Sequence, residues 1–105
     1  MKTYFLVRDD VPLGLAITAV AHAAAAMILK WLNPDLPKKD PVMIEWLISF
    51  KKVVCKVTPE EFEAAKEFPD FIELTESALG GIPTCLVFKP RAEWPERFKY
   101  YKLYK

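Results

Sequence analysis

The single histidine of this chain, His22, lies in the middle of an alanine-rich apolar segment at residues 14–31, GLAITAVAHAAAAMILKW. Imidazole changes its charge near neutral pH, so a histidine in an uncharged helix is either a packed, hydrogen-bonded core residue or a chemically active group. Lone buried histidines are more often structural than catalytic. From the residue alone we therefore expect a core histidine and keep a catalytic role as the alternative.

Cations and aromatic rings alternate along the C-terminal part of the chain. The cations are Lys89, Arg91, Arg97, Lys99, Lys102 and Lys105, and the rings are Phe88, Trp94, Phe98, Tyr100, Tyr101 and Tyr104. Such a mixture can neutralise phosphates and stack on unpaired bases, as nucleic-acid-binding surfaces do. The composition fits equally well with rings that build a core beneath a solubilising cationic rim, so both interpretations stay open.

Several standard sites are absent from the sequence. It has no P-loop, no GxGxxG or GxSxG motif, no HExxH motif and no paired cysteines, so we expect no cofactor and no metal. Cys55 and Cys85 lie on separate apolar segments, which predicts two reduced core thiols. Four carboxylates follow a strong helix start and predict a solvated helix face: Glu60, Glu61, Glu63 and Glu67.

Length and charge limit the class of protein. A chain of 105 residues fits one domain, residues 1–105, and a net charge of +1 means that affinity for nucleic acid requires local clustering of cations. The uncharged run at residues 11–29 is nearly long enough to cross a bilayer, but it contains Pro12, Thr18 and His22, so we expect no membrane span. The run follows a charged Arg8-Asp9-Asp10 cluster, unlike a signal peptide, and we expect a cytoplasmic protein.

Hydrophobic patterning predicts alternating strands and helices. The strongest helix start is Thr58-Pro59-Glu60-Glu61, a capping box, with a helix running to about Phe68. Strands are expected at 3–8, 51–57, 71–74 and 84–89, other helices at 14–31 and 42–49, and a short helix followed by an edge-pairing segment at 92–105. This order predicts an α/β single-domain sandwich, with a mixed sheet of about four strands, helices on both faces and the alanine-rich helix enclosed on all sides.

Four blocks of the sequence, in order, resemble the peptidyl-tRNA hydrolase type 2 family, and within it the divergent peptidyl-tRNA hydrolase domain-containing branch. The blocks are YFLVRDD at 4–10, AVAHAA at 19–24, KKVVCKVTPEEFEAAKE at 51–67 and IPTCLVFKPRAEWPERFKYYKLYK at 82–105. The resemblance spans nearly the whole chain. It implies a compact α/β fold and hydrolysis of the ester that joins a peptide to its tRNA, with the tRNA acceptor end as partner and a homodimer left open.

The resemblance also suggests site residues. His22 falls on the histidine of the family's first helix and would orient or deprotonate water, which makes it the catalytic candidate. The binding candidates are Arg8 and Asp10 at the end of the first strand, Thr84 before the last core strand, and Lys89 and Arg91 after it. For catalysis by this set, His22 and Lys89 should open into the same cleft.

The chain also departs from the family pattern. The active enzymes begin the first helix with Gly-Lys and carry Gln three residues before the histidine, where this chain has Gly14-Leu15 and Ala19. The family's Asp and Thr after the last core strand are Lys89 and Glu93 here. Two hypotheses therefore remain: a peptidyl-tRNA hydrolase, or a catalytically weak or inactive module that binds a tRNA end or a protein on the same scaffold.

Overall fold

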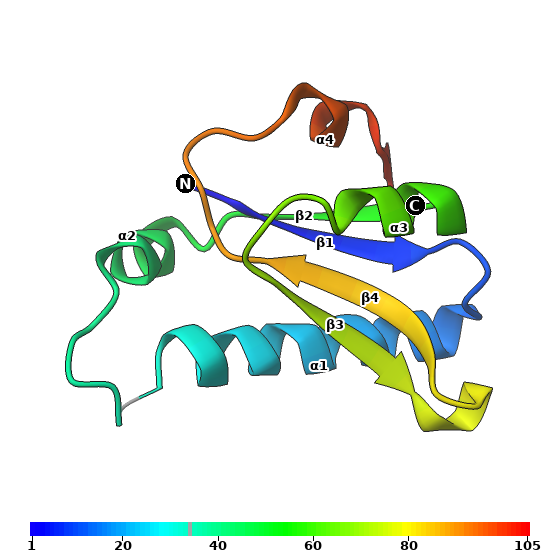
Figure 1. The fold of residues 1–105 in the computed structure, drawn as a ribbon, viewed down its shortest axis with the longest axis horizontal. Helices are drawn as coiled ribbons and strands as arrows, with labels where there is room; N and C mark the ends of the chain where they lie inside the picture. Colours follow the sequence, from blue (N-terminus) through cyan, green and yellow to red (C-terminus); the bar gives the residue numbers. More distant parts are fainter. Residues whose placement is uncertain (34) are drawn as a thin grey trace.

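The computed structural model describes residues 1–33 and 35–105, and it has an α/β fold with one mixed sheet (Figure 1). The elements follow the order β1 (Thr3–Arg8), α1 (Leu13–Trp31), α2 (Pro41–Ser49), β2 (Lys52–Val57), α3 (Pro59–Ala65), β3 (Phe71–Glu76), a 3-10 turn (Ser77–Leu79), β4 (Ile82–Phe88), α4 (Glu96–Tyr100) and β5 (Lys102–Leu103). The strand order in the sheet is β3-β4-β1-β2-β5, and only β1 and β2 pair in parallel. The α/β sheet predicted from the sequence is thus confirmed, with five strands.

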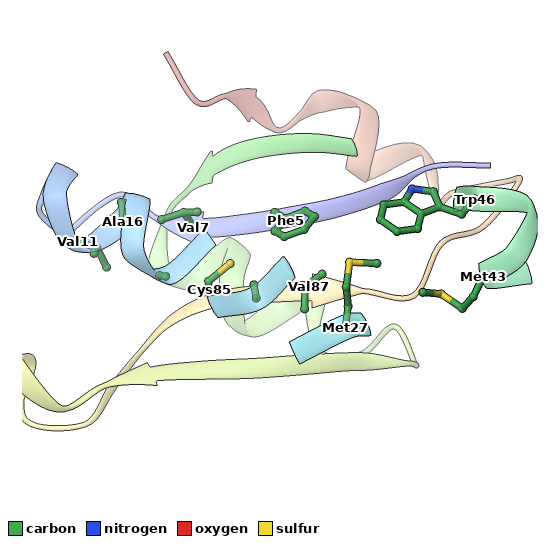
Figure 2. Close-up of a cluster of buried hydrophobic side chains, with 11 residues drawn as sticks. Phe5, Val7, Val11, Ala16, Met27, Met43, Trp46, Cys85 and Val87 are labelled. Atoms are coloured by element: carbon green, nitrogen blue, oxygen red, sulfur yellow. The ribbon is translucent and has the colours of Figure 1, made fainter. Parts of the chain in front are cut away.

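Helices cover both faces of this sheet, as the sequence predicts. In β1, Phe5 and Val7 point toward α1, while Tyr4 and Leu6 point toward α3 and α4, because alternate side chains of a strand face opposite sides. Figure 1 shows α1 running along one face and α3 and α4 lying over the other. The buried side chains of the α1 face, which include Phe5 and Met27, form the cluster in Figure 2.

Helices α2 and α3 begin at side-chain caps, Asp40 and Thr58, whereas α1 and α4 begin without one. The Thr58 hydroxyl accepts a hydrogen bond from the backbone of Glu61, and the Glu61 carboxylate accepts one from the backbone of Thr58, so the predicted capping box is present. Helix α3 ends at Ala65, however, and not near Phe68. Beyond Ala65 the chain tightens into 3-10-type turns, in which the backbone N–H groups of Lys66, Glu67 and Phe68 each donate to the carbonyl three residues earlier.

Helix α1 differs most from expectation, because it covers the sheet without being covered itself. Its buried residues form a single stripe, Ala16, Ala19, Ala23 and Met27, and no helix of the described part packs on the opposite side (Figure 1). His22 is exposed, so the expectation of a core histidine is wrong, as is that of a helix enclosed on all sides. One helical layer buries only the stripe that faces the sheet, whatever the hydrophobicity of the rest.

Candidate functional site

Arg8 and Asp10 lie together at the carboxyl end of β1. The Arg8 guanidinium donates two hydrogen bonds to the Asp10 carboxylate, at 3.0 Å from Nε and 2.6 Å from Nη2. These bonds lower the pKa of Asp10. Each group therefore already has a charged partner of ideal shape, and a ligand would have to compete with that pair.

Thr84 lies at the same end of the sheet but inside it. The register between β3 and β4 shifts beside Leu74 and Thr75, and Pro83 supplies no backbone donor there. The Thr84 hydroxyl is buried and donates a hydrogen bond of 3.2 Å to the carbonyl of Leu74. This hydroxyl closes the irregular ladder and does not face a cleft.

Lys89 follows β4 at the opposite end of the sheet. Its ammonium forms an ion pair with Asp40, the N-cap of α2, whose side chain also accepts a hydrogen bond of 2.9 Å from the backbone of Val42. The bond from Lys89 is the main cause that lowers the pKa of Asp40. The charge of Lys89 is therefore used to anchor α2 to the sheet.

The side chains of Arg91 and Lys89 lie on opposite faces of the sheet, although the two residues are close in sequence. Its guanidinium stacks on the ring of Phe68, 4.4 Å from the centroid, and Phe68 belongs to the cluster beneath α3 and α4. Lys89 instead faces the α1 and α2 side through Asp40. The two cations that the resemblance would group as phosphate contacts thus serve two different faces of the fold.

His22 lies on the flank of α1, one residue and therefore about 100° around the helix from buried Ala23. The five ion pairs among the described residues do not involve it. The four principal hollows of the described part include neither His22 nor Lys89. The residues suggested by the resemblance are therefore distributed over both ends of the sheet and over α1.

The largest of these hollows, about 840 Å³, lies beyond the carboxyl ends of the parallel strands β1 and β2. It is lined by Asp9, Lys56, Thr58, Glu61, Tyr100, Lys102, Leu103 and Lys105. The carboxyl ends of parallel strands are where open α/β sheets most often bind ligands. We call this region the cationic hollow, because three lysines line it.

The charged side chains of the cationic hollow differ in whether they already have a partner within the protein. The Glu61 carboxylate accepts a hydrogen bond of 2.9 Å from the backbone of Thr58, within the capping box. Lys56 places its ammonium 5.2 Å from the centre of the Tyr104 ring, and none of the five ion pairs among the described residues involves Lys56, Lys102 or Lys105. An anionic ligand could therefore meet three ammonium groups that form no ion pair within the described residues, beside the carboxylates of Asp9 and Glu61.

Sequence reasoning located this region only in part. Tyr100, Lys102 and Lys105 belong to the cation and aromatic segment, but Lys56 and Asp9 were not identified as site residues. The sequence did contain a signal for Asp9 and Lys56, because they lie at the ends of the two predicted strands that finish at Arg8 and Val57. A right-handed crossover makes such strands parallel and brings their carboxyl ends to one edge of the sheet.

Metal-ligand geometry and comparisons with known proteins give no further information about this site. Among residues 1–33 and 35–105, no three His, Cys, Asp or Glu side chains lie close enough to hold a metal ion. No model of a known protein family matches the chain, and no curated protein matches it. The site geometry and the four sequence blocks are therefore the observations that bear on function.

Proposed function

We propose that this protein binds the acceptor end of a tRNA in the cationic hollow, on a scaffold that resembles peptidyl-tRNA hydrolase type 2, and that it releases peptide slowly or not at all. The observation that carries the proposal is the juxtaposition of Lys56, Lys102 and Lys105 with Tyr100, whose side chain is 77% exposed. Ammonium groups contact phosphates, and an exposed ring offers a stacking surface to an unpaired base.

The positions of the candidate catalytic residues disfavour rapid turnover. Ester hydrolysis needs a base that holds water near the carbonyl and donors that stabilise the developing oxyanion. His22 lies about 14 Å along α1 from the start of the helix at 1.5 Å per residue, and it does not line the cationic hollow. Lys89 is paired with Asp40, and the Thr84 hydroxyl is bonded to Leu74. An ester bound in the cationic hollow would therefore find neither His22 as a base nor Lys89 and Thr84 as oxyanion donors.

Titration with tRNA over a range of salt concentrations tests the binding proposal. Three lysine contacts to a single-stranded end predict a log–log slope of about −2, which is about 15- to 20-fold weaker binding at 200 mM salt than at 50 mM. The variant Lys102→Glu/Lys105→Glu should bind at least about tenfold more weakly, because both exposed ammonium groups reverse their charge.

The matched control is Lys38→Glu/Lys39→Glu, which makes the same charge change at exposed positions of the loop before α2. It should bind tRNA within about twofold of the wild type once salt screens distant charges. An equal loss in both variants, or wild-type binding that does not respond to salt, would contradict the proposal.

Hydrolysis of peptidyl-tRNA is the second candidate function, favoured by the exposure of His22, which leaves its imidazole accessible to a substrate. A defined peptidyl-tRNA should lose its peptide at the background rate in the presence of the wild-type protein. Release above background that disappears in His22→Ala would replace the binding module with a hydrolase.

A further inference from the structure

A second hollow lies on the face of the sheet that α3 and α4 cover, between α4 and the strands β1, β2 and β5 (Figure 1). It has a volume of about 330 Å³, at the lower end of the range for small-molecule sites. No carboxylate of the described residues lines it, and within that part of the chain it shares only Leu103 with the cationic hollow. Its polar lining consists of two ammonium groups, two phenols and a thiol: Lys2, Lys99, Tyr4, Tyr101 and Cys55. We call this separate site the tyrosine hollow.

Tyr4 is buried at the wall of the tyrosine hollow, but its hydroxyl has no partner. The residue is 3% exposed, and its ring lies 4.8 Å from that of Trp94 and 5.2 Å from that of Phe98, centroid to centroid. The side-chain hydrogen bonds of the described residues do not include this hydroxyl. It is nevertheless not sealed in the core, because among the described residues Nε of Arg97 is the one fully buried side-chain N or O atom without a partner. A buried phenol normally finds a hydrogen-bond partner, and a ligand in the tyrosine hollow would supply one.

Two ammonium groups and a second phenol complement the Tyr4 hydroxyl. The Lys2 ammonium lies 5.3 Å from the centre of the Tyr4 ring, and Lys99 belongs to α4. None of the five ion pairs among the described residues involves either lysine. Burial raises the pKa of Cys55 to about 11, and the nearby charge of Lys2 opposes that rise. Burial also raises the pKa of Tyr101, so its phenol keeps its proton at neutral pH and can donate a hydrogen bond.

The charge of the tyrosine hollow favours one class of anion. A phosphate monoester carries about −1.5 to −2 charges at pH 7, which two ammonium groups can balance, whereas a carboxylate carries a single charge. Its three terminal oxygens can accept hydrogen bonds from both ammonium groups and from the phenols. The remaining lining is apolar and consists of Val53, Phe98 and Leu103. Such a surface suits a flat apolar body attached to the phosphate.

We propose that the tyrosine hollow binds a small phosphate monoester with an aromatic body, whose phosphate lies beside Lys2 and Lys99 and accepts a hydrogen bond from the Tyr4 hydroxyl. The aromatic body packs on the apolar lining. A bound ligand of this kind blocks the approach to Cys55, which lines the same hollow. The site is independent of the RNA proposed to bind in the cationic hollow.

Protection of Cys55 from iodoacetamide in a phosphate-free buffer tests the proposal, with phenyl phosphate as the probe. Phenyl phosphate should bind with a dissociation constant of about 1 mM, the affinity expected of a ligand with about ten non-hydrogen atoms. At ten times that concentration it should slow the labelling of Cys55 about tenfold, because only the free protein reacts. Cys85 is the internal control, because it lies beneath α1 on the other face, and its labelling rate should not change.

Benzoate and phenol separate the contribution of the phosphate from that of the ring. Benzoate should require an about tenfold higher concentration for the same protection, because its single charge balances only one of the two lysines. Phenol, which carries no charge at neutral pH, should not protect Cys55.

Variants of the lining residues test the individual contacts, with binding of phenyl phosphate measured by calorimetry. Lys2→Gln/Lys99→Gln should bind at least about tenfold more weakly, because both ammonium groups are lost. Tyr4→Phe keeps the packed ring and should bind about three- to tenfold more weakly, because it removes one hydrogen bond to a charged group. Lys38→Gln/Lys39→Gln is the matched control at exposed loop positions and should bind within about twofold of the wild type.

Three results would overturn the proposal. The first is labelling of Cys55 that phenyl phosphate does not slow, or slows no more than that of Cys85. The second is equal protection by phenol or by benzoate, and the third is unchanged affinity in Lys2→Gln/Lys99→Gln. None of these results bears on tRNA binding, which the Lys102→Glu/Lys105→Glu variant tests separately.

Discussion

Aromatic rings cover one face of the sheet, whereas alanines cover the other. On the first face, the ring of Phe98 in α4 lies within 5.5 Å, centroid to centroid, of five other rings: Tyr4, Phe68, Phe88, Trp94 and Tyr101. On the second face, the buried stripe of α1 consists of three alanines and Met27. Large rings fill the space beneath the short helices α3 and α4, while small side chains bring the long helix α1 close to the sheet but bury little of its surface.

This difference shows which face of the molecule has exposed side chains that a ligand could contact. The aromatic face uses its rings within the fold and holds Arg91 on Phe68. The α1 face leaves Ile17 and His22 exposed, and an apolar groove of about 250 Å³ between α1 and β2 lies at its edge. The C-terminal cation and aromatic segment thus supplies rings to the core and also leaves a ring at the surface, because Phe98 is buried while Tyr100 is 77% exposed.

The largest expected effect is on the aromatic face. Phe98→Ala should lower the free energy of unfolding by about 3–5 kcal/mol, because it leaves a cavity among five rings. Tyr100→Ala, two residues along the same helix, is the control and should cost less than about 0.5 kcal/mol. Urea unfolding measures both. Equal costs would mean that α4 is not packed on the sheet as described.

A smaller effect distinguishes the N-caps of the helices on the two faces. Asp40→Ala, at α2, and Thr58→Ala, at α3, should each lower the free energy of unfolding by about 1–2 kcal/mol at pH 7, because each removes an N-cap acceptor. The Lys89 ammonium holds the pKa of Asp40 below its ordinary value. The Asp40 contribution is therefore complete above the unfolded pKa, about 3.9, and is lost as the pH falls through the lower folded value.

Urea titrations at pH 7 and pH 3 measure this difference. The cost of Asp40→Ala should shrink at pH 3, while that of Thr58→Ala should change less, because a hydroxyl acceptor does not titrate. Asp40→Asn is the control that keeps an N-cap acceptor without the charge. A cost of Asp40→Ala that stays constant with pH would contradict a role for the ion pair with Lys89.

The smallest effect concerns the two thiols, which lie one on each face. Both are free and buried, as the sequence predicts. Burial raises the pKa of Cys55 to about 11 and that of Cys85 to about 12. Cys55 also lines a hollow of about 330 Å³ beside α4, whereas Cys85 is enclosed beneath α1. Cys55 should therefore react with iodoacetamide about tenfold faster, because one pKa unit changes the thiolate fraction tenfold.

Mass spectrometry of the labelled protein at pH 7 to 9 measures both rates, and Cys55→Ser assigns them. Each rate should rise about tenfold per pH unit, because the thiolate is the reactive form. Faster labelling of Cys85 would indicate that α1 separates from the sheet more readily than α4 does.

Local features of the fold could be predicted where neighbouring residues determine them. The Thr58 and Glu61 capping box depends on residues only three positions apart, and the structure confirms it. The candidate site could be predicted only in part. Its lysines come from β2, β5 and the chain beyond β5, and their proximity depends on which strands become neighbours.

The sequence by itself determined the strand and helix types, because hydrophobic period and capping chemistry act over a few residues. Which residues of α1 are buried was decided by the sheet against which the helix packs. Only the tertiary structure decided which polar groups remain available for binding. Asp40 takes up the charge of Lys89, the irregular ladder takes up the hydroxyl of Thr84, and the ring of Phe68 takes up Arg91. Asp40 and Phe68 are distant in sequence from the cations that they hold, and Leu74 lies on the strand paired with that of Thr84, so strand pairing and helix packing bring these groups together.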